Sequence, residues 1–231
     1  MLRNETDIAV VGADIGGCIA ALALAPYYSV TLIDIQETSP PRVGESLPFG
    51  VKRIFSHLDL MDLLQEQYVT SHGLVSYWGA EQQSGLEELG NIDGMGWQVN
   101  RQSLEQALRD TARKRGVTCL WPCTLQSSSQ DNEHWQLHLS SQQADRQLAQ
   151  ESVLKAKVVI DATGRQCTFA RQQGARRQQL DRLVSVWMTY SAPVSRQLSS
   201  IHSTANGWWY SAPIPQLLSL IHISEPTRLR S

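Results

Sequence analysis

The chain has 231 residues, of which 42% are hydrophobic and 18% are charged, so it is too apolar for a disordered protein. Its 20 Lys and Arg residues against 22 Asp and Glu residues give a formal net charge of −2. That balance offers no electrostatic reason for nucleic acid or an anionic membrane to be the main partner. We expect one large folded domain or two small ones, and neither nucleic-acid nor membrane binding.

The N-terminal residues and the cysteines indicate a reduced, cytoplasmic protein. Residues 1–7 are polar, the apolar stretch that follows is broken by glycines, and no run approaches the roughly 18 apolar residues of a membrane span. Four cysteines without a Cys-x-x-Cys pair are too sparse for a disulfide framework. Cys119 and Cys123 could form a metal site with His134 and His138, but we favour unliganded core cysteines and predict no metal.

The first forty residues have the pattern of a nucleotide-binding βαβ unit. Residues 8–11 predict a buried parallel strand, residues 15–25 a closely packed helix and residues 29–34 a second buried strand. Asp34 ends the second strand 22 positions after Gly12, the spacing at which a carboxylate accepts hydrogen bonds from an adenosine ribose. The residues between the first strand and the helix that we expect to contact a dinucleotide are Gly12, Ala13, Asp14, Gly16 and Gly17.

One residue of this turn departs from the dinucleotide fingerprint. Asp14 stands where glycine lets the backbone approach the pyrophosphate. Two like charges about 5 Å apart repel by about 3 kcal/mol at an effective dielectric near 20. We therefore predict dinucleotide binding that is weakened roughly a hundredfold, but not abolished. The alternative is a glycine-rich turn that packs a helix and binds nothing.

Three later segments occur in an order that identifies a family. Gly44-Glu45-Ser46-Leu47-Pro48 follows a Pro-rich loop, residues 96–101 end in Arg101 at the start of a helix over 102–115, and residues 158–161 predict a strand that runs into Asp161-Ala-Thr-Gly164. Together with the first turn, they resemble the flavin-dependent monooxygenases, in particular the branch that contains the flavin-dependent halogenases. The resemblance implies FAD as cofactor, with contacts from the residues Arg42, Glu45, Ser46, Arg101, Asp161 and Gly164.

Each of these residues also has an ordinary structural interpretation. Thr163 could cap a turn after a strand, and Arg101 could be a solvated charge at a helix end. Glu45 and Ser46 could be turn and cap residues before the apolar stretch 47–60. The order of the segments, rather than any one residue, favours the flavoprotein.

Two features of the halogenases are missing or altered. No lysine lies between Lys52 and Lys114, where the resembled halogenases have the lysine that passes the halogen to the substrate, and His72 is a poor substitute. Residues 207–213 are similar to the Trp-x-Trp-x-Ile-Pro motif, but Tyr210 replaces the second Trp. Halogenation is therefore disfavoured.

The resemblance implies a monooxygenase in which reduced flavin and oxygen form a peroxide that attacks a tryptophan-like aromatic. Trp78, Trp208 and Tyr210 are the candidates for the substrate pocket, although they could equally be sheet core. The substrate is expected to be a small aromatic or a tryptophan in a partner protein, because residues 208–213 also look like those of flavoproteins encoded beside quinone-cofactor oxidases. A separate flavin reductase is a possible partner. The alternatives are a flavin-dependent reductase or saturase, a halogenase and a non-catalytic nucleotide-binding module.

The predicted fold is α/β, with a Rossmann-type FAD-binding domain interleaved with an incomplete antiparallel substrate sheet. We place the FAD-binding domain at 1–174 with a substrate-domain insertion near 72–98, and the start of the substrate domain at 175–216, where residues 183–190 predict an alternating strand and residues 208–212 its partner. Residues 217–231 resemble a translated sequencing adapter, so we expect a non-native tail, with a genuine strand over 217–223 as the alternative. The family's later Gly-Asp motif is absent, since no Gly-Asp dipeptide occurs in the chain. We therefore expect the fragment to be inactive, with open sheet edges.

Overall fold

The computed structural model describes residues 4–43, 45–64, 68–79, 84–87, 95–131, 133–141, 150–191, 197–215 and 217–224. The chain divides into two compact units, which are described separately below. The first unit comprises Met1–Pro40 and Glu105–Arg177, and the second comprises Pro41–Leu104 and Gln178–Ser231. The predicted insertion near 72–98 therefore lies within a longer part of the second unit, 41–104.

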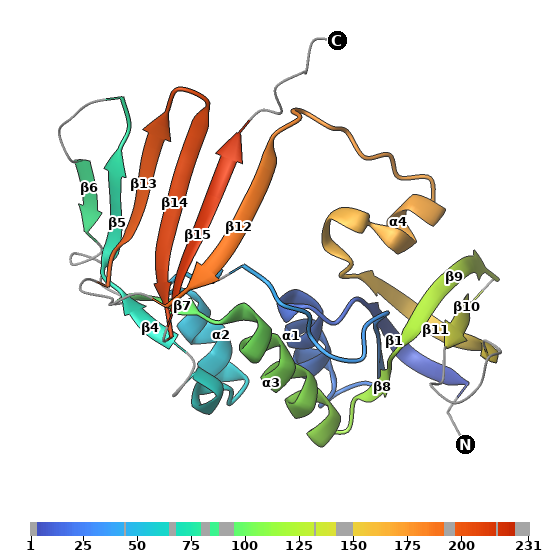
Figure 1. Ribbon diagram of the computed structural model, residues 1–231. Coiled ribbons are helices and arrows are strands. Elements are labelled where there is room, and N and C mark those ends of the chain that lie inside the picture. The colour runs from blue at the N-terminus through green and yellow to red at the C-terminus, as the bar shows by residue number, and fades with distance from the viewer. Residues whose placement is uncertain are drawn as a thin grey trace, which may run out of the picture. The chain divides into compact units, whose positions relative to one another are not determined.

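The first unit is built on a six-stranded sheet with the order β8-β2-β1-β11-β10-β9 (Figure 1). Its strands are β1 (Glu5–Val11), β2 (Val30–Ile33), β8 (Thr118–Leu120), β9 (Cys123–Gln130), β10 (Trp135–Ser141) and β11 (Gln150–Asp161). The pairs β1/β11, β1/β2 and β2/β8 are parallel, whereas β10 is antiparallel to both of its neighbours. The predicted Rossmann-type βαβ unit with a mainly parallel sheet is therefore confirmed.

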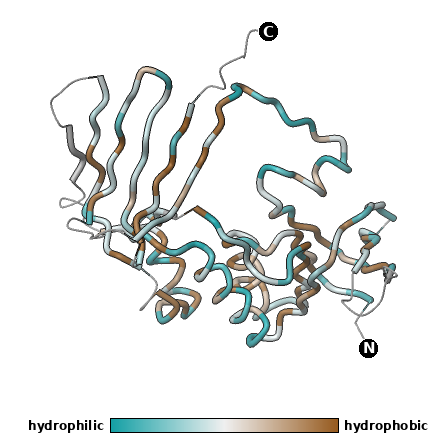
Figure 2. The backbone as a smooth tube through the Cα atoms, viewed as in Figure 1, coloured by the Kyte–Doolittle hydropathy of each residue, from teal (hydrophilic) through white to brown (hydrophobic). Residues whose placement is uncertain are grey.

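The position of the central strands in the core of this unit explains why their sequences are continuous runs of apolar residues. β2 is buried at all four positions, since a parallel strand in the middle of a sheet is covered on both faces. Side chains from β1, β9, β10 and β11 form one apolar cluster that includes Val11, Leu137 and Leu154, against which Trp135 and Phe169 pack. Hydrophobic residues accordingly follow these strands in Figure 2.

Four helical segments matter for the site. α1 (Ile15–Leu24) follows β1, and α3 (Arg101–Lys114) begins one residue before the helix that the sequence predicts. After β11 the chain forms the 3-10 helix η3 (Gly164–Gln166) and the short helix α4 (Thr168–Gln172). Within the described residues, no helix is long and apolar enough to cross a membrane.

The second unit contains a six-stranded sheet with the order β12-β15-β14-β13-β5-β6 and a three-stranded sheet with the order β3-β7-β4. All pairs are antiparallel except β13/β5. Its elements are β3 (Glu45–Leu47), α2 (Val51–His57), η1 (Met61–Leu64), β4 (Tyr68–Ser71), β5 (Gly73–Tyr77), β6 (Ser84–Glu87), β7 (Gly96–Val99), β12 (Val184–Tyr190), β13 (Ser199–Thr204), β14 (Gly207–Ile214) and β15 (Leu217–Ser224).

One strand pairing differs from the sequence interpretation. We expected residues 208–212 to pair with the strand over 183–190, but β14 pairs with β13 and β15, and β15 lies between β14 and β12. The cause is local connectivity, because short turns let β13, β14 and β15 form consecutive hairpins. Residues 217–224 are thus a strand, as in the alternative left open above, while the resemblance of 217–231 to an adapter stays a prediction.

The glycines of α1 differ sharply in the space around them. A Cβ on Gly17 would lie 1.9 Å from the carbonyl oxygen of Gly12, whereas a Cβ on Gly16 would have no atom within 4 Å. Gly17 therefore allows the helix to pack on the turn, and Gly16 does not serve packing.

We predict opposite effects of two alanine substitutions in α1. Gly17→Ala should lower the free energy of unfolding by about 1–3 kcal/mol or more, because backbone must move to admit the methyl group. Gly16→Ala should raise it by about 0.5–1 kcal/mol, because alanine costs less conformational entropy in a helix. Urea denaturation followed by circular dichroism measures both, and equal effects of the two substitutions would contradict the packing argument.

Candidate functional site

The glycine turn of the first unit lies directly against the second predicted motif. Gly12 has a φ of +104°, and a Cβ at this position would lie 2.5 Å from the carbonyl oxygen of Ala162. The amide of Ala162 donates a hydrogen bond to the carbonyl oxygen of Val11 at 2.7 Å. The turn after β1 and the Asp161–Gly164 segment after β11 therefore meet at the carboxyl edge of the sheet, where α/β proteins bind ligands.

Asp14 occupies the N-cap position of α1. Its backbone is extended, with φ −70° and ψ 179°, and its side chain caps no backbone amide of the helix. Its carbonyl oxygen accepts the hydrogen bond from Cys18 N–H at 2.9 Å, which begins the helical ladder. The positive end of the helix dipole stabilises a carboxylate at this position. The same carboxylate places negative charge where a phosphate would bind.

Asp34 uses most of its hydrogen-bonding capacity within the protein. Its Oδ2 accepts from Ala13 N–H at 2.6 Å, and its Oδ1 accepts from Gln36 N–H at 2.8 Å. Arg109 Nη2 also lies 3.1 Å from Oδ1. A carboxylate has about four acceptor positions, so the one left over must serve any ribose hydroxyl. Asp34 thus fixes the turn as well as offering a ligand contact.

Arg109 is the functional-site residue that the sequence interpretation missed. Its side chain is 2% exposed, and it connects α3 to both ends of the turn–strand unit. Nε donates to the carbonyl oxygen of Ala13 at 3.1 Å, Nη1 donates to that of Gln36 at 2.8 Å, and Nη2 pairs with Asp34. Its spacing of four from Glu105 is typical of a surface ion pair, so the pattern held no signal for its burial.

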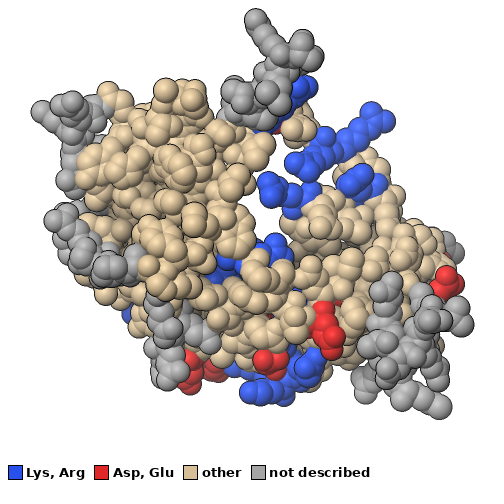
Figure 3. All heavy atoms as spheres, in the orientation of Figure 1, with Lys and Arg blue, Asp and Glu red and all other residues tan. Residues whose placement is uncertain are grey.

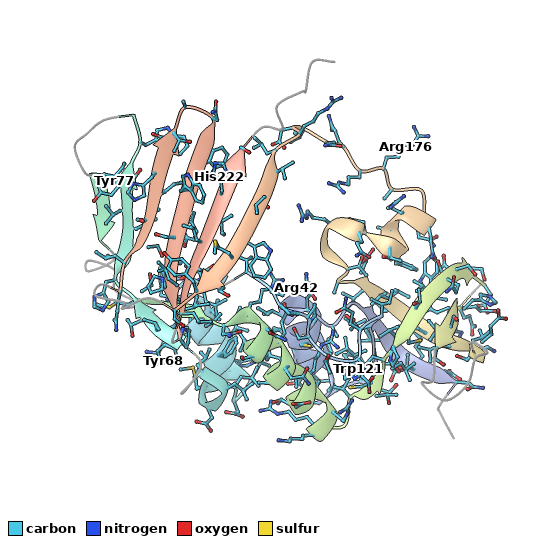
Figure 4. All side chains as sticks on the ribbon, viewed as in Figure 1. Arg42, Tyr68, Tyr77, Trp121, Arg176 and His222 are labelled. Atoms are coloured by element: carbon cyan, nitrogen blue, oxygen red, sulfur yellow. The ribbon has the colours of Figure 1, made fainter. Side chains whose placement is uncertain are left out.

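Trp121 contacts both the buried Arg109 and the exposed Arg113 of α3. The guanidinium carbons of Arg109 and Arg113 lie 5.1 and 5.2 Å from the centre of its ring, within the range of cation–π attraction. Figure 4 shows Trp121 beside the end of α3. The buried arginine is therefore held on one side by a carboxylate and on another by an aromatic ring.

Asp161 of the second motif serves mainly to fold the segment that follows it. Its Oδ1 accepts from Thr163 N–H at 3.0 Å and from the Thr163 hydroxyl at 2.6 Å, and its Oδ2 accepts from Ala170 N–H at 2.8 Å. Burial raises the pKa of Asp161, but these hydrogen bonds outweigh burial and leave its pKa below the usual value. The carboxylate therefore stabilises the fold above the pKa of the unfolded chain, and this stabilisation is lost as the pH falls.

Of the remaining candidates for cofactor contacts, several lie at element ends. Arg42 is exposed in the loop before β3, Ser46 is exposed in β3, and Arg101 begins α3 half-buried. Gly164 begins η3 with a φ of +58°. Gly44 and the side chain of Glu45 lie outside the described residues.

A buried amide in the second unit joins three serine hydroxyls from different strands. Gln98 is 2% exposed, and its Nε2 lies 3.1 Å from Ser46 Oγ, 2.9 Å from Ser199 Oγ and 3.5 Å from Ser71 Oγ. The hydroxyl of Tyr210 donates to Ser199 Oγ at 3.2 Å. A buried amide is costly without partners, so this network links a predicted cofactor residue, Ser46, to a predicted substrate residue, Tyr210.

The predicted aromatic residues separate into core and surface. Trp97 is 8% exposed and packs against Tyr68 with 5.6 Å between ring centres, so it belongs to the core. Trp78 is 56% exposed, and its ring lies 5.9 Å from that of Trp208. Tyr210 shares a face of β14 with Trp208, because side chains alternate along a strand.

The cysteines carry no metal-binding arrangement. Burial raises the pKa of Cys18 to about 12 and that of Cys119 to about 11, so both thiols are protonated at neutral pH. Burial also raises the pKa of Cys123. Among the described residues, no group of three or more His, Cys, Asp and Glu side chains could hold a metal ion.

We predict that Arg109 stabilises the first unit far more than its neighbour one turn along α3. Arg109→Met should lower the free energy of unfolding by about 3–5 kcal/mol, because it leaves Asp34 buried without its charge partner. Arg113→Met removes the same charge and an exposed ring contact, and it should cost about 0.5–1 kcal/mol. Urea denaturation of the two variants checks this, and similar losses would show that Arg109 does not fix the turn.

The comparisons with known proteins agree with this geometry. The chain is 24% identical over 221 residues to LodB of Marinomonas mediterranea, which is described as an FAD-dependent oxidoreductase, and the match covers 93% of the chain and 58% of LodB. The chain thus spans somewhat over half the length of that curated relative.

Two solved structures show the same fold. The flavin-dependent halogenase CmlS is 22% identical with a TM-score of 0.80, over 96% of this chain and 42% of CmlS. The peptidyl tryptophan dihydroxylase QhpG, essential for tryptophylquinone cofactor biogenesis, is 23% identical with a TM-score of 0.67, over 98% of this chain and 47% of QhpG. The sequence profile of the FAD binding domain family matches residues 5–217, and the chain therefore belongs to that family, with FAD as its cofactor.

Proposed function

We propose that this chain is part of an FAD-dependent monooxygenase that acts on a tryptophan-like aromatic substrate. The observation that carries the proposal is the aromatic pair formed by the exposed Trp78 and the half-buried Trp208, beside Tyr210, whose hydroxyl belongs to the Gln98 network. Aromatic side chains recognise an indole by stacking and edge contacts. The same network reaches Ser46, which we propose to face the flavin.

The residues of the first unit fit the adenosine and diphosphate part of FAD in most respects. The first amides of α1 are free of helical partners because of their position, so they are available to phosphate oxygens. Gly16 leaves open space beside them, and Asp34 retains one acceptor position for a ribose hydroxyl. Asp14 is the departure, because its charge opposes the phosphates.

The proposed contacts come from several separate segments of the chain. Gly12, Ala13, Gly16 and Gly17 would hold the diphosphate, and Asp34 the ribose. Arg42, Glu45, Ser46, Arg101, Asp161 and Gly164 would lie along the rest of the cofactor.

FAD, when bound, supplies the redox chemistry by taking electrons from a donor and passing them to oxygen. The protein then has to orient the aromatic ring and exclude water, which the aromatic pair and the buried Gln98 network suit.

Hydroxylation is favoured over halogenation by two considerations. The stretch between Lys52 and Lys114 holds no lysine to present an activated halogen, and His72 is exposed in the turn between β4 and β5. QhpG, whose fold this chain shares, is a dihydroxylase of peptidyl tryptophan. The substrate would accordingly be a small aromatic or a tryptophan of a partner protein, with electrons from a separate flavin reductase and the reaction in the cytoplasm.

The dinucleotide turn yields a prediction on cofactor affinity. Asp14→Gly should tighten FAD binding roughly a hundredfold, because it removes about 3 kcal/mol of repulsion between the carboxylate and the diphosphate. Titration of FAD into both proteins, followed by flavin fluorescence, measures the change. Equal affinities would mean that the Asp14 carboxylate turns away from the phosphates.

The reaction itself is tested with a protein of the full length of the curated relative, since this chain spans 58% of LodB. With reduced FAD, isotopically labelled oxygen gas and a tryptophan peptide, we expect a product that carries labelled oxygen. Trp208→Leu should lower the rate about tenfold or more, a loss of about 1.4 kcal/mol of transition-state binding. Trp209→Leu serves as the matched control, because Trp209 points to the other face and stacks on His222.

Other products would identify other members of the same fold. A brominated peptide in the presence of bromide would show a halogenase. A reduced product without oxygen consumption would show a reductase or saturase. A full-length protein that binds no FAD would contradict both the proposal and the fit of the glycine turn.

A further inference from the structure

Positive charge is concentrated in one segment of an otherwise acidic chain. Residues 164–182 contain five arginines and a single acidic residue, Asp181, although the whole chain has a net charge of −2. The five are Arg165, Arg171, Arg176, Arg177 and Arg182. Figure 3 shows blue side chains gathered over this region, and Figure 2 shows that α4 and the segment after it are largely hydrophilic. The function proposed above uses none of these arginines.

Three of the arginines surround the same cleft in the first unit. The cleft has a volume of about 910 Å³, and it is lined by Arg165, Arg171, Arg177, Gln166, Thr168 and Gln172. Among the described residues, no carboxylate lines the cleft. Within the ranges that the structure describes, none of the three guanidinium groups forms an ion pair. Their charges therefore have no counter-charge from the part of the chain that the structure describes.

The short helix that carries Arg171 is held in place by contacts from both ends. α4 has only five residues, too few to be stable by itself. Its first amide, Thr168 N–H, donates to Thr163 Oγ1 at 2.8 Å, and Ala170 N–H donates to Asp161. Phe169 packs edge-on against Trp135, with 4.9 Å between ring centres.

The far end of α4 is tied to β9. Gln172 Oε1 accepts from the Ser128 hydroxyl at 2.6 Å, and Gln172 Nε2 donates to the carbonyl oxygen of Gln126 at 3.2 Å. Gln173 Nε2 donates to Ser128 Oγ at 2.8 Å. Arg171 is thus presented from a fixed frame, whereas Arg165 lies in η3 just before α4 and Arg177 lies in the exposed segment that follows α4.

This combination has a specific chemical meaning. Arginines that converge without counter-charges repel one another, and the repulsion is relieved when an anion enters. A guanidinium donates two parallel hydrogen bonds that match phosphate oxygens, and the Thr168 hydroxyl adds a neutral partner. The volume falls in the range of small-molecule sites, which is larger than one phosphate ion requires.

We propose that the cleft formed by Arg165, Arg171 and Arg177 is a binding site for a phosphorylated small molecule up to the size of a nucleotide. The site is separate from the glycine turn, because none of residues 12–17 lines the cleft. The phosphate groups would lie between the three guanidiniums. The rest of the ligand would occupy the remaining volume beside Gln166 and Thr168.

The first test uses inorganic pyrophosphate as the probe and isothermal titration calorimetry of the whole chain. We expect saturable binding that Arg171→Gln weakens about tenfold or more, since a bidentate phosphate contact is lost. Arg176→Gln is the matched control, because it removes the same charge one residue from Arg177 but lines no part of the cleft. Figure 4 shows Arg176 on the segment beyond α4.

Two outcomes of this test would overturn the proposal. One is the absence of saturable pyrophosphate binding. The other is an equal loss in Arg176→Gln and Arg171→Gln, which would show only a diffuse attraction that salt screens. Arg171 is exposed, so its replacement should leave the unfolding midpoint unchanged and the comparison valid.

The second test separates the sources of the phosphate group. Pyrophosphate bound at the cleft should be displaced by NADPH or ADP if the cleft accepts nucleotides, and by neither if it accepts only smaller phosphorylated compounds. Both results support a phosphate site and define its ligand. FAD is the remaining competitor. If FAD displaces pyrophosphate and Arg171→Gln weakens FAD equally, the cleft belongs to the flavin site and the inference of a separate site fails.

Discussion

The buried guanidinium of Arg109 is the interaction on which the dinucleotide end of the first unit depends. Three of its donors bind the carbonyl oxygens of Ala13 and Gln36 and the carboxylate of Asp34. Burial of this charge is tolerated because these three acceptors and the ring of Trp121 surround it. Helix α3, the turn after β1 and the end of β2 are thereby held in one arrangement, in which no single element could be moved without leaving a charge unpaired.

The glycines of the turn also fix its position, because the backbone packs too closely around two of them to admit a side chain. Gly12 lies against the backbone of Ala162, and Gly17 lies against the carbonyl of Gly12, so neither position admits a side chain. The fingerprint residues that serve packing are thus present, and the one that serves the ligand, at position 14, is replaced. The fold of the turn and its affinity for a diphosphate are separable properties. A turn can keep the geometry of the family while its charge opposes the ligand.

The sequence predicted β1, α1, β2, α3 and the end of β11 because parallel strands and their glycine turn have strong local patterns, whereas β8, β9, β10 and α4 were not predicted. α1, α3 and the end of β11 lie within about two residues of their predicted positions, as expected for periodicity arguments. Arg109 and Gln98 could not be found in this way. Both are polar residues whose partners lie far along the chain, and a buried polar group has no period that distinguishes it from an exposed one. The order of β14 and β15 was missed because strand pairing depends on turns and not on alternation alone.

The distribution of charge gives the first unit two unlike ligand regions along one sheet edge. At the end of β1, Asp14 adds negative charge to a turn built for phosphate, while the segment after β11 carries three arginines that line one cleft, one of them on the helix α4 that Asp161 holds in place. The Asp161 carboxylate accepts hydrogen bonds from amides of that segment and forms no ion pair with the three arginines among the described residues. Under the proposal of a phosphate site in the cleft, anions are drawn to the end of β11 more strongly than to the end of β1. A cofactor whose diphosphate binds at the glycine turn must do so through backbone amides, against the local charge, which makes the free N–H groups of α1 the decisive contacts there.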